Sequence, residues 1–247
     1  MFKSFQDTSA LQQFHSFPNL NMQQATSAYG FSGVTFWLDA AYGLNTQTNL
    51  GAVSSWQQRV GGGTFVQGTA GAQPRLILND ANYNNLPSVE AQDNARFMDT
   101  VLGSGLKMSV PNVTVAVISK VNTANQRNVL MSLSTSTGTG IFDGGIRVNY
   151  NGFGWYVSDF SVLIGTTETL TTRIKILTGT NVIVNGVNET TGNVGSTQTE
   201  LNRLFRFDAS TSNLIGSIAE IIVFGYSMTS DEAIALSNNI NQKYAIY

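Results

Sequence analysis

The chain has 247 residues and no cysteine. It contains 13 Lys and Arg residues and has a formal net charge of −2. These numbers exclude disulfides, thiolate metal sites and cysteine nucleophiles, and the scattered basic residues disfavour nucleic acid or an anionic membrane as a partner. The apolar fraction of 42% is enough for a sizeable core, while the charged fraction is only 11%.

Residues 1–33 are predicted to form a separate N-terminal arm. Apolar residues stand unevenly among Gln, Ser and Asn, and Pro18 would end a short helix over residues 7–16. The arm either packs on its own domain or docks onto another chain and anchors the protein to an assembly. The candidate assembly residues are Phe2, Phe5, Leu11, Phe14 and Phe17.

Residues 34–98 are typical of short strands joined by turns, because β-branched and aromatic runs alternate with Gly, Asn and Pro. We expect Trp37 and Trp56 to fill a core between two sheets, although stacking on a sugar is the alternative. Asp39 follows Trp37 by two positions, so a regular strand places both on one face. Its carboxylate is expected to cap turn amides, with metal binding as the alternative.

The middle of the chain contains the strongest strand pattern, over residues 113–119, and then a region rich in Gly and aromatic residues. Aromatic side chains beside Asn and Asp suit a sugar ring, which needs an apolar face to stack on and amides for its hydroxyls. A core strand with a polar turn is the competing interpretation. The candidate carbohydrate-binding residues are Tyr150, Asn151, Trp155, Tyr156 and Asp159.

The last third predicts a hairpin over residues 172–185 and a loop over residues 187–203. Thr229 and Glu232 form a capping-box pattern that begins a C-terminal helix. The helix carries an apolar stripe at helical spacing, formed by Ala233, Leu236, Ile240 and Tyr244.

Several motifs of this chain occur together in one known family. They are Trp-x-Asp-Ala from residue 37, Val-Ser-x-Trp from residue 53 with a Gly-rich turn, Gln-Pro, Leu-Pro-x-Val, and the ending Ala-Glu-Ile-Ile-Val with Lys-Tyr. This order resembles laminin-G-like domains of the concanavalin A-like lectin/glucanase superfamily, of the type found in phage and bacterial proteins. The resemblance implies a two-sheet β-sandwich and does not imply one function.

Catalytic and metal motifs are weak. The paired carboxylates that glycosidases of this superfamily carry as Glu-x-Asp-x-x-Glu are missing from the sequence, so we expect no enzyme. A hydrolase built from scattered carboxylates is the alternative. The single histidine, His15, lies in the arm. No cofactor is expected, although three oxygen-rich residues could bind Ca²⁺, namely Asp93, Asn94 and Asp99.

We therefore expect an all-β, two-sheet antiparallel jelly-roll sandwich over residues 34–247, with a C-terminal helix and the arm over residues 1–33. The missing cysteines, the absent signal peptide and the aromatic arm favour a structural protein of a phage virion, on capsid or tail. It would be made in the host cytoplasm and join other virion proteins or copies of itself. Its sandwich would either bind cell-surface glycans or only decorate and stabilise the shell. The alternative is a free bacterial carbohydrate-binding module or adhesin.

Overall fold

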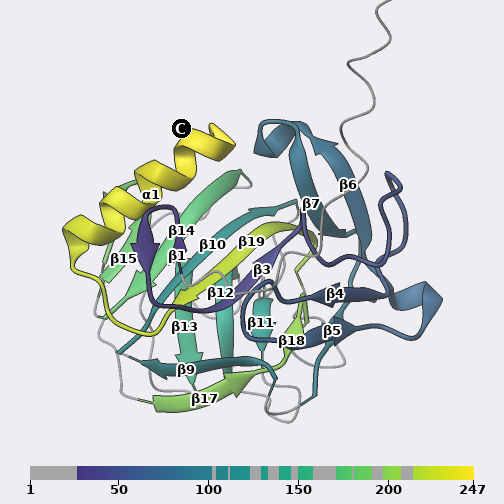
Figure 1. Ribbon diagram of the computed structural model, residues 1–247, viewed down its shortest axis with the longest axis horizontal. Coiled ribbons are helices and arrows are strands. Elements are labelled where there is room, and N and C mark those ends of the chain that lie inside the picture. Colours follow the sequence, from purple (N-terminus) through teal and green to yellow (C-terminus); the bar gives the residue numbers. More distant parts are fainter. Residues whose placement is uncertain are drawn as a thin grey trace, which may run out of the picture.

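The computed structural model describes residues 27–101, 104–110, 112–122, 129–132, 139–145, 150–157, 171–179, 181–190, 197–206 and 214–247. Within these residues, the strands form two large antiparallel sheets and two small strand pairs, and one α-helix follows at the C-terminal end (Figure 1). The predicted all-β, two-sheet antiparallel sandwich with a C-terminal helix is confirmed. None of the described helices has the length and apolar content to cross a membrane.

The larger sheet has eight strands in the described part of the chain, and its long central strands are β10 and β19. Its order is β16 (Val187–Asn188), β15 (Asn181–Val184), β14 (Thr172–Thr178), β10 (Thr114–Val121), β19 (Gly216–Phe224), β7 (Leu86–Ala91) and β6 (Arg75–Asp80), with β3 (Val34–Asp39) also paired to β19.

The smaller sheet has seven strands in the part of the chain that is described. Its order is β13 (Tyr150–Val157), β12 (Thr139–Gly145), β11 (Val129–Ser132), β18 (Arg203–Leu204), β8 (Met98–Asp99), β5 (Thr64–Val66) and β4 (Ser55–Gln57). A separate ribbon joins β9 (Leu106–Val110) to β17 (Thr197–Leu201). The prediction of a loop over residues 187–203 is therefore wrong at residues 197–201, which form β17. The polar sequence Thr-Gln-Thr-Glu lacks the apolar alternation that predicts a strand, and pairing with β9 holds it in the sheet.

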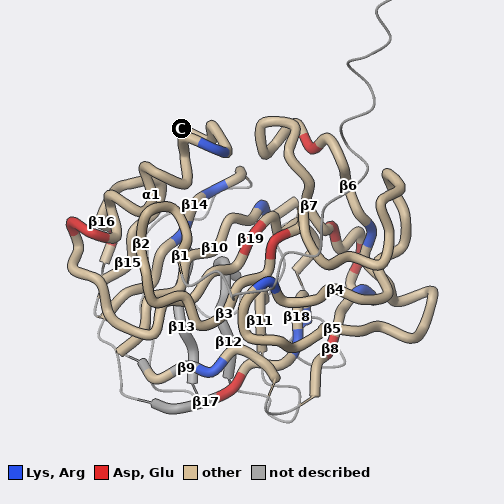
Figure 2. Tube along the Cα trace, viewed as in Figure 1, with Lys and Arg blue, Asp and Glu red and all other residues tan. Residues whose placement is uncertain are grey.

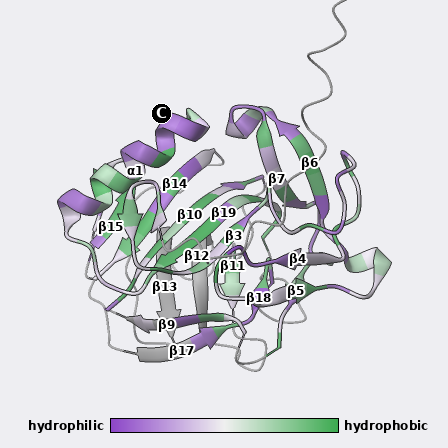
Figure 3. Ribbon diagram, viewed as in Figure 1, coloured by the Kyte–Doolittle hydropathy of each residue, from purple (hydrophilic) through white to green (hydrophobic). Residues whose placement is uncertain are grey.

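The main core lies between the two sheets and takes one face of each long strand. On β10, Val115 and Val117 point into this core, while Ala116 and Ile118 point to the opposite face of the sheet. Both faces of β10 are buried, which explains why its sequence is apolar almost throughout. Figure 3 shows the same hydrophobic character along much of β10 and β19.

Of the two tryptophans expected in this core, only Trp56 lies there. It is fully buried, and its indole N–H donates to the carbonyl of Asp39 at 3.1 Å. The prediction for Trp37 is wrong, because strand alternation sends Phe36 and Leu38 inward and turns Trp37 to the outer face of the larger sheet.

A second apolar cluster covers that outer face. Helix α1 (Ser230–Tyr244) packs on β14 and β15 through the four predicted stripe residues, all of which are buried (Figure 1). The capping box is confirmed, since Thr229 accepts from the amide of Glu232 and the Glu232 carboxylate accepts from the amide of Thr229. The Asn185-Gly186 turn after the predicted hairpin is also present, with φ of 48° and 76°.

A short N-terminal hairpin completes this second layer. β1 (Ser27–Ala28) pairs with β2 (Phe31–Ser32) through Tyr29 and Gly30, which have φ of 53° and 84°. Ala28 is buried, and the ring of Phe31 meets that of Phe224 edge to face, with centroids 6.4 Å apart. Residues 27–33, assigned to the arm from the sequence, thus pack on the sandwich, while the five candidate assembly residues lie outside the described residues.

Replacing Trp56 with Ala tests the main core. We expect a loss of about 3–5 kcal/mol in the free energy of unfolding, because the change empties a fully buried site and removes an indole hydrogen bond. Urea unfolding measures it. Val187→Ala is the control, since Val187 is 59% exposed and should change stability by less than about 0.5 kcal/mol. Similar losses for both variants would contradict this assignment of the core.

Candidate functional site

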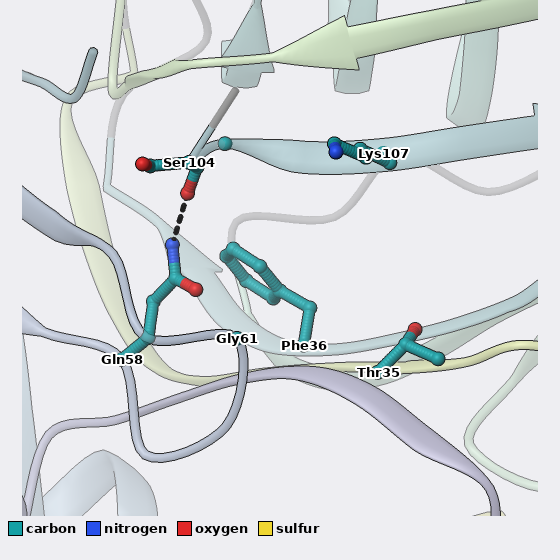
Figure 4. A pocket seen from close by; sticks show the side chains of 7 residues that line it. Thr35, Phe36, Gln58, Gly61, Ser104 and Lys107 are labelled. Carbon is teal, nitrogen blue, oxygen red and sulfur yellow. Dashed lines mark hydrogen bonds between the residues drawn. The ribbon is translucent and has the colours of Figure 1, made fainter. Parts of the chain in front are cut away.

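A pocket of about 200 Å³ lies beside β3, where the chain after β4 and the start of β9 come together (Figure 4). The first wall is residues 35–36 of β3, and the second is Gln58 and Gly61 in the segment after β4. The third is residues 104–107, at the start of β9. Seven described residues line it: Thr35, Phe36, Gln58, Gly61, Ser104, Gly105 and Lys107.

The Gly-rich turn at residues 61–63 fits closely against the pocket walls. A Cβ on Gly61 would lie 2.2 Å from the side-chain oxygen of Gln58, and one on Gly63 would lie 2.5 Å from the carbonyl oxygen of Ser104. Gly61 also has a φ of 106°, which favours glycine. Glycine is therefore required here by space and by backbone conformation.

Gln58 connects two walls of the pocket. Only 4% of this residue is exposed, and its amide nitrogen donates to the carbonyl of Ser104 at 2.6 Å. Figure 4 shows the amide oxygen on the same side as the ring of Phe36, and this oxygen also lies against Gly61. The amide nitrogen thus fixes the side chain, and the oxygen remains available to accept from a ligand.

The other polar side chains of the pocket have few protein partners. Thr35 makes one long bond, from its hydroxyl to the carbonyl of Val223 at 3.4 Å. Within the described residues, the hydroxyl of Ser104 and the ammonium of Lys107 have no hydrogen bond or ion pair. The pocket therefore combines a buried aromatic ring with hydroxyl, amide and ammonium groups, a set suited to a small polar ligand.

The carbohydrate-binding residues predicted from sequence lie elsewhere. Tyr150, Asn151, Trp155 and Tyr156 are in β13, at the edge of the smaller sheet, and Asp159 lies outside the described residues. Among the described strands, β13 pairs with β12 alone, in a register that sets Trp155 opposite Ile141. Their role stays a prediction, and the pocket beside β3 is a site that the sequence analysis missed.

The residues considered for Ca²⁺ are engaged in other contacts. Asp93 accepts from the amide of Ala95 at 2.8 Å and pairs with Arg96 at 3.2 Å. Asp99 on β8 forms a bidentate pair with Arg203, at 2.6 and 2.8 Å. Among the described residues, no group of three or more His, Cys, Asp or Glu side chains is arranged to hold a metal ion. The calcium prediction, which includes Asn94, stays untested.

A network of buried polar side chains lies on the outer face of the larger sheet, separate from the pocket. Glu220 on β19 has no exposed side-chain area and accepts from the hydroxyl of Tyr29 at 2.7 Å and from the ammonium of Lys243. Burial raises the pKa of Glu220, and the nearby carboxylate of Asp39 raises it further. Burial, together with Glu220, likewise raises the pKa of Tyr29 and of Tyr244.

Asp39 is the cross-strand partner of Glu220. As expected from the sequence, it shares a face with Trp37 and caps a turn amide, that of Ala41, at 2.9 Å. Its other oxygen pairs with Arg59 at 3.0 Å, and the guanidinium of Arg59 lies 4.3 Å from the Trp37 ring centroid. The two carboxylates are thus neighbours, but each is buried and paired with a cation, so this pair does not form an open acid pair in a groove.

Comparison with known proteins identifies the fold class. No protein-family model and no curated protein matches the sequence. The chain is similar to Trypanosoma rangeli sialidase, with 11% identity and a TM-score of 0.50 over 87% of this chain and 34% of that chain. A complex of that enzyme with 2,3-difluoro-KDN gives 9% identity and a TM-score of 0.50, over 92% and 36% of the two chains. The chain spans about a third of the length of these sialidases.

These comparisons confirm a β-sandwich, the coarser part of the resemblance drawn from the sequence. The expectation that the protein is not an enzyme is corrected, because solved chains that share the fold at a TM-score of 0.50 are sialidases. The missing Glu-x-Asp-x-x-Glu motif excludes one catalytic pattern and does not exclude others. At 9–11% identity, the similarity shows the fold alone and assigns no activity to this chain.

A methyl group at Gly63 should distort the pocket. Gly63→Ala places the new carbon 2.5 Å from the Ser104 carbonyl and 2.7 Å from the Gln58 amide nitrogen, so we expect a loss of about 1–3 kcal/mol in the free energy of unfolding. Gly68→Ala is the matched control, because nothing lies within 4 Å of its added carbon. Urea unfolding of both variants decides the point, and equal stabilities would show that the turn does not pack as described.

The buried Glu220 should make stability depend on pH in a defined direction. Because its pKa is raised in the folded chain, its contribution is fully favourable below its ordinary pKa and is lost as pH rises through the folded value. The unfolding free energy of the natural chain minus that of Glu220→Gln should therefore fall as pH rises above the ordinary pKa of a glutamate. Urea unfolding at several pH values gives this difference, and a constant difference would contradict the shift.

Proposed function

We propose that the protein is a glycan-binding domain with a laminin-G-like sandwich, and that it holds one sugar unit in the pocket beside β3. The observation that carries the proposal is the pocket lining. It combines the ring of Phe36 with the uncommitted amide oxygen of Gln58 and the hydroxyls of Thr35 and Ser104. A sugar ring offers hydroxyls that both donate and accept, and it has an apolar face.

The size of the pocket supports a single ring. A volume of about 200 Å³ is below the roughly 300–1,000 Å³ typical of sites for larger small molecules. The remainder of a glycan chain would then extend away over the surface. One of the similar sialidase structures, with 10% identity and a TM-score of 0.50, is a complex with sialic acid, which agrees with a sugar ligand without assigning one.

Removing the pocket hydroxyls tests the proposal. A Thr35→Val and Ser104→Ala double variant keeps the shape of the pocket and should weaken glycan binding about tenfold or more, since lost hydrogen bonds cost about 0.5–1.5 kcal/mol each. A glycan array followed by calorimetry on the bound glycan measures it. Gln242→Ala, on the exposed side of α1, is the control for binding.

A third variant separates this pocket from the surface predicted on β13. Trp155→Ala should leave binding unchanged if the pocket beside β3 is the site. Loss of binding in Trp155→Ala, with unchanged binding in the double variant, would move the site to β13. An array on which the natural chain binds no glycan would remove the proposed function.

We also propose that this domain belongs to a phage particle, with its N-terminal segment as the anchor. The supporting features are the cysteine-free, weakly charged composition and the aromatic residues before residue 27. Because residues 27–33 pack on the sandwich, a truncation should remove residues 1–26 only. Light scattering of the natural and truncated chains, and incorporation of each into particles, test the anchor; normal incorporation of the truncated chain would exclude it.

A further inference from the structure

The pocket beside β3 has a distinct charge. Of the seven described residues that line it, Lys107 is the only ionisable one. Lys107 lies on β9 with an exposed side chain and has no ion pair with any described residue. By contrast, Arg59, Arg75, Arg96, Arg203 and Lys243 each pair with a carboxylate.

The acid opposite Lys107 on the neighbouring strand is bonded to the backbone of the pocket wall. Glu200 on β17 is the cross-strand partner of Lys107, and Figure 2 shows the two opposite charges side by side on this ribbon. The carboxylate of Glu200 accepts from the amide of Gly105 at 2.8 Å, and Glu200 is not among the lining residues. Glu200 thus binds the amide of a lining residue and forms no ion pair with Lys107, so the ammonium of Lys107 can pair with a ligand.

We propose that the sugar bound in this pocket is an acidic one, carrying a carboxylate that pairs with Lys107. This inference rests on the proposed function and names its ligand class. The ammonium would donate to the carboxylate, while the oxygen of Gln58 and the hydroxyl of Ser104 bind hydroxyls of the same ring. Uronic acids and nonulosonic acids such as N-acetylneuraminic acid both have this chemistry.

Matched sugar pairs test the carboxylate directly. The probes are methyl glucuronide with methyl glucoside, methyl galacturonide with methyl galactoside, and the methyl glycoside of N-acetylneuraminic acid with its carboxyl-reduced alcohol. Affinities come from NMR titration of the full chain. We expect at least one acidic sugar to bind about tenfold more tightly than its neutral partner, which corresponds to about 1.4 kcal/mol, and the advantage to shrink as salt is added.

Variants of the lysine complete the test. Lys107→Met should abolish the preference for the acidic sugar while binding of the neutral sugar stays unchanged, and Lys107→Arg should keep the preference. Lys120→Met is the charge-matched control, because Lys120 instead bonds to Asn82 at 2.9 Å. Which pair responds distinguishes a uronic acid from a nonulosonic acid.

The possible failures are distinguishable. Equal or tighter binding of the neutral sugars by the natural chain, or a preference that survives Lys107→Met, would overturn the acidic ligand and leave the glycan site standing. If neither member of any pair binds, and the array is also blank, the proposed function itself is wrong and the inference falls with it.

Discussion

The architecture depends on one buried carboxylate, that of Glu220 in the middle of β19. It binds Tyr29 of the N-terminal hairpin and Lys243 of the C-terminal helix, so two segments that are far apart in sequence are fixed to the same central strand. A charge removed from water is costly unless it is paired and hydrogen-bonded. The position of Glu220 is therefore tolerated only while both segments are in place, which favours one arrangement of the outer layer over others.

The same region fixes the geometry of the pocket. Asp39, beside Glu220, pairs with Arg59, and the amide of Arg59 donates to the carbonyl of Trp37 at 2.7 Å. These bonds hold the segment that carries Gln58 and the glycine turn against β3. The pocket walls are thus extensions of a rigid sheet, and a ligand would meet groups that are already oriented, which lowers the entropic cost of binding.

Local signals in the sequence predicted local structure well. Thr229 and Glu232 specify the start of the helix, and Asn185-Gly186 specifies a turn, because each acts through neighbouring backbone groups. Trp37 was misplaced because apolar residues occupy both faces of β3, so alternation alone does not tell which face is the core. The pocket could not be predicted, because Gln58, Ser104 and Lys107 are far apart in sequence and come together only in the folded chain. The run of glycines at residues 61–63 was the one sequence feature that indicated a close approach of the backbone there.

The pairing of five cations with carboxylates has a consequence for the behaviour of the protein in solution. With those charges neutralised in pairs, much of the exterior consists of amides and hydroxyls, whose hydration changes little with dissolved electrolyte. The folded chain should therefore keep its stability at low and at high salt concentration alike.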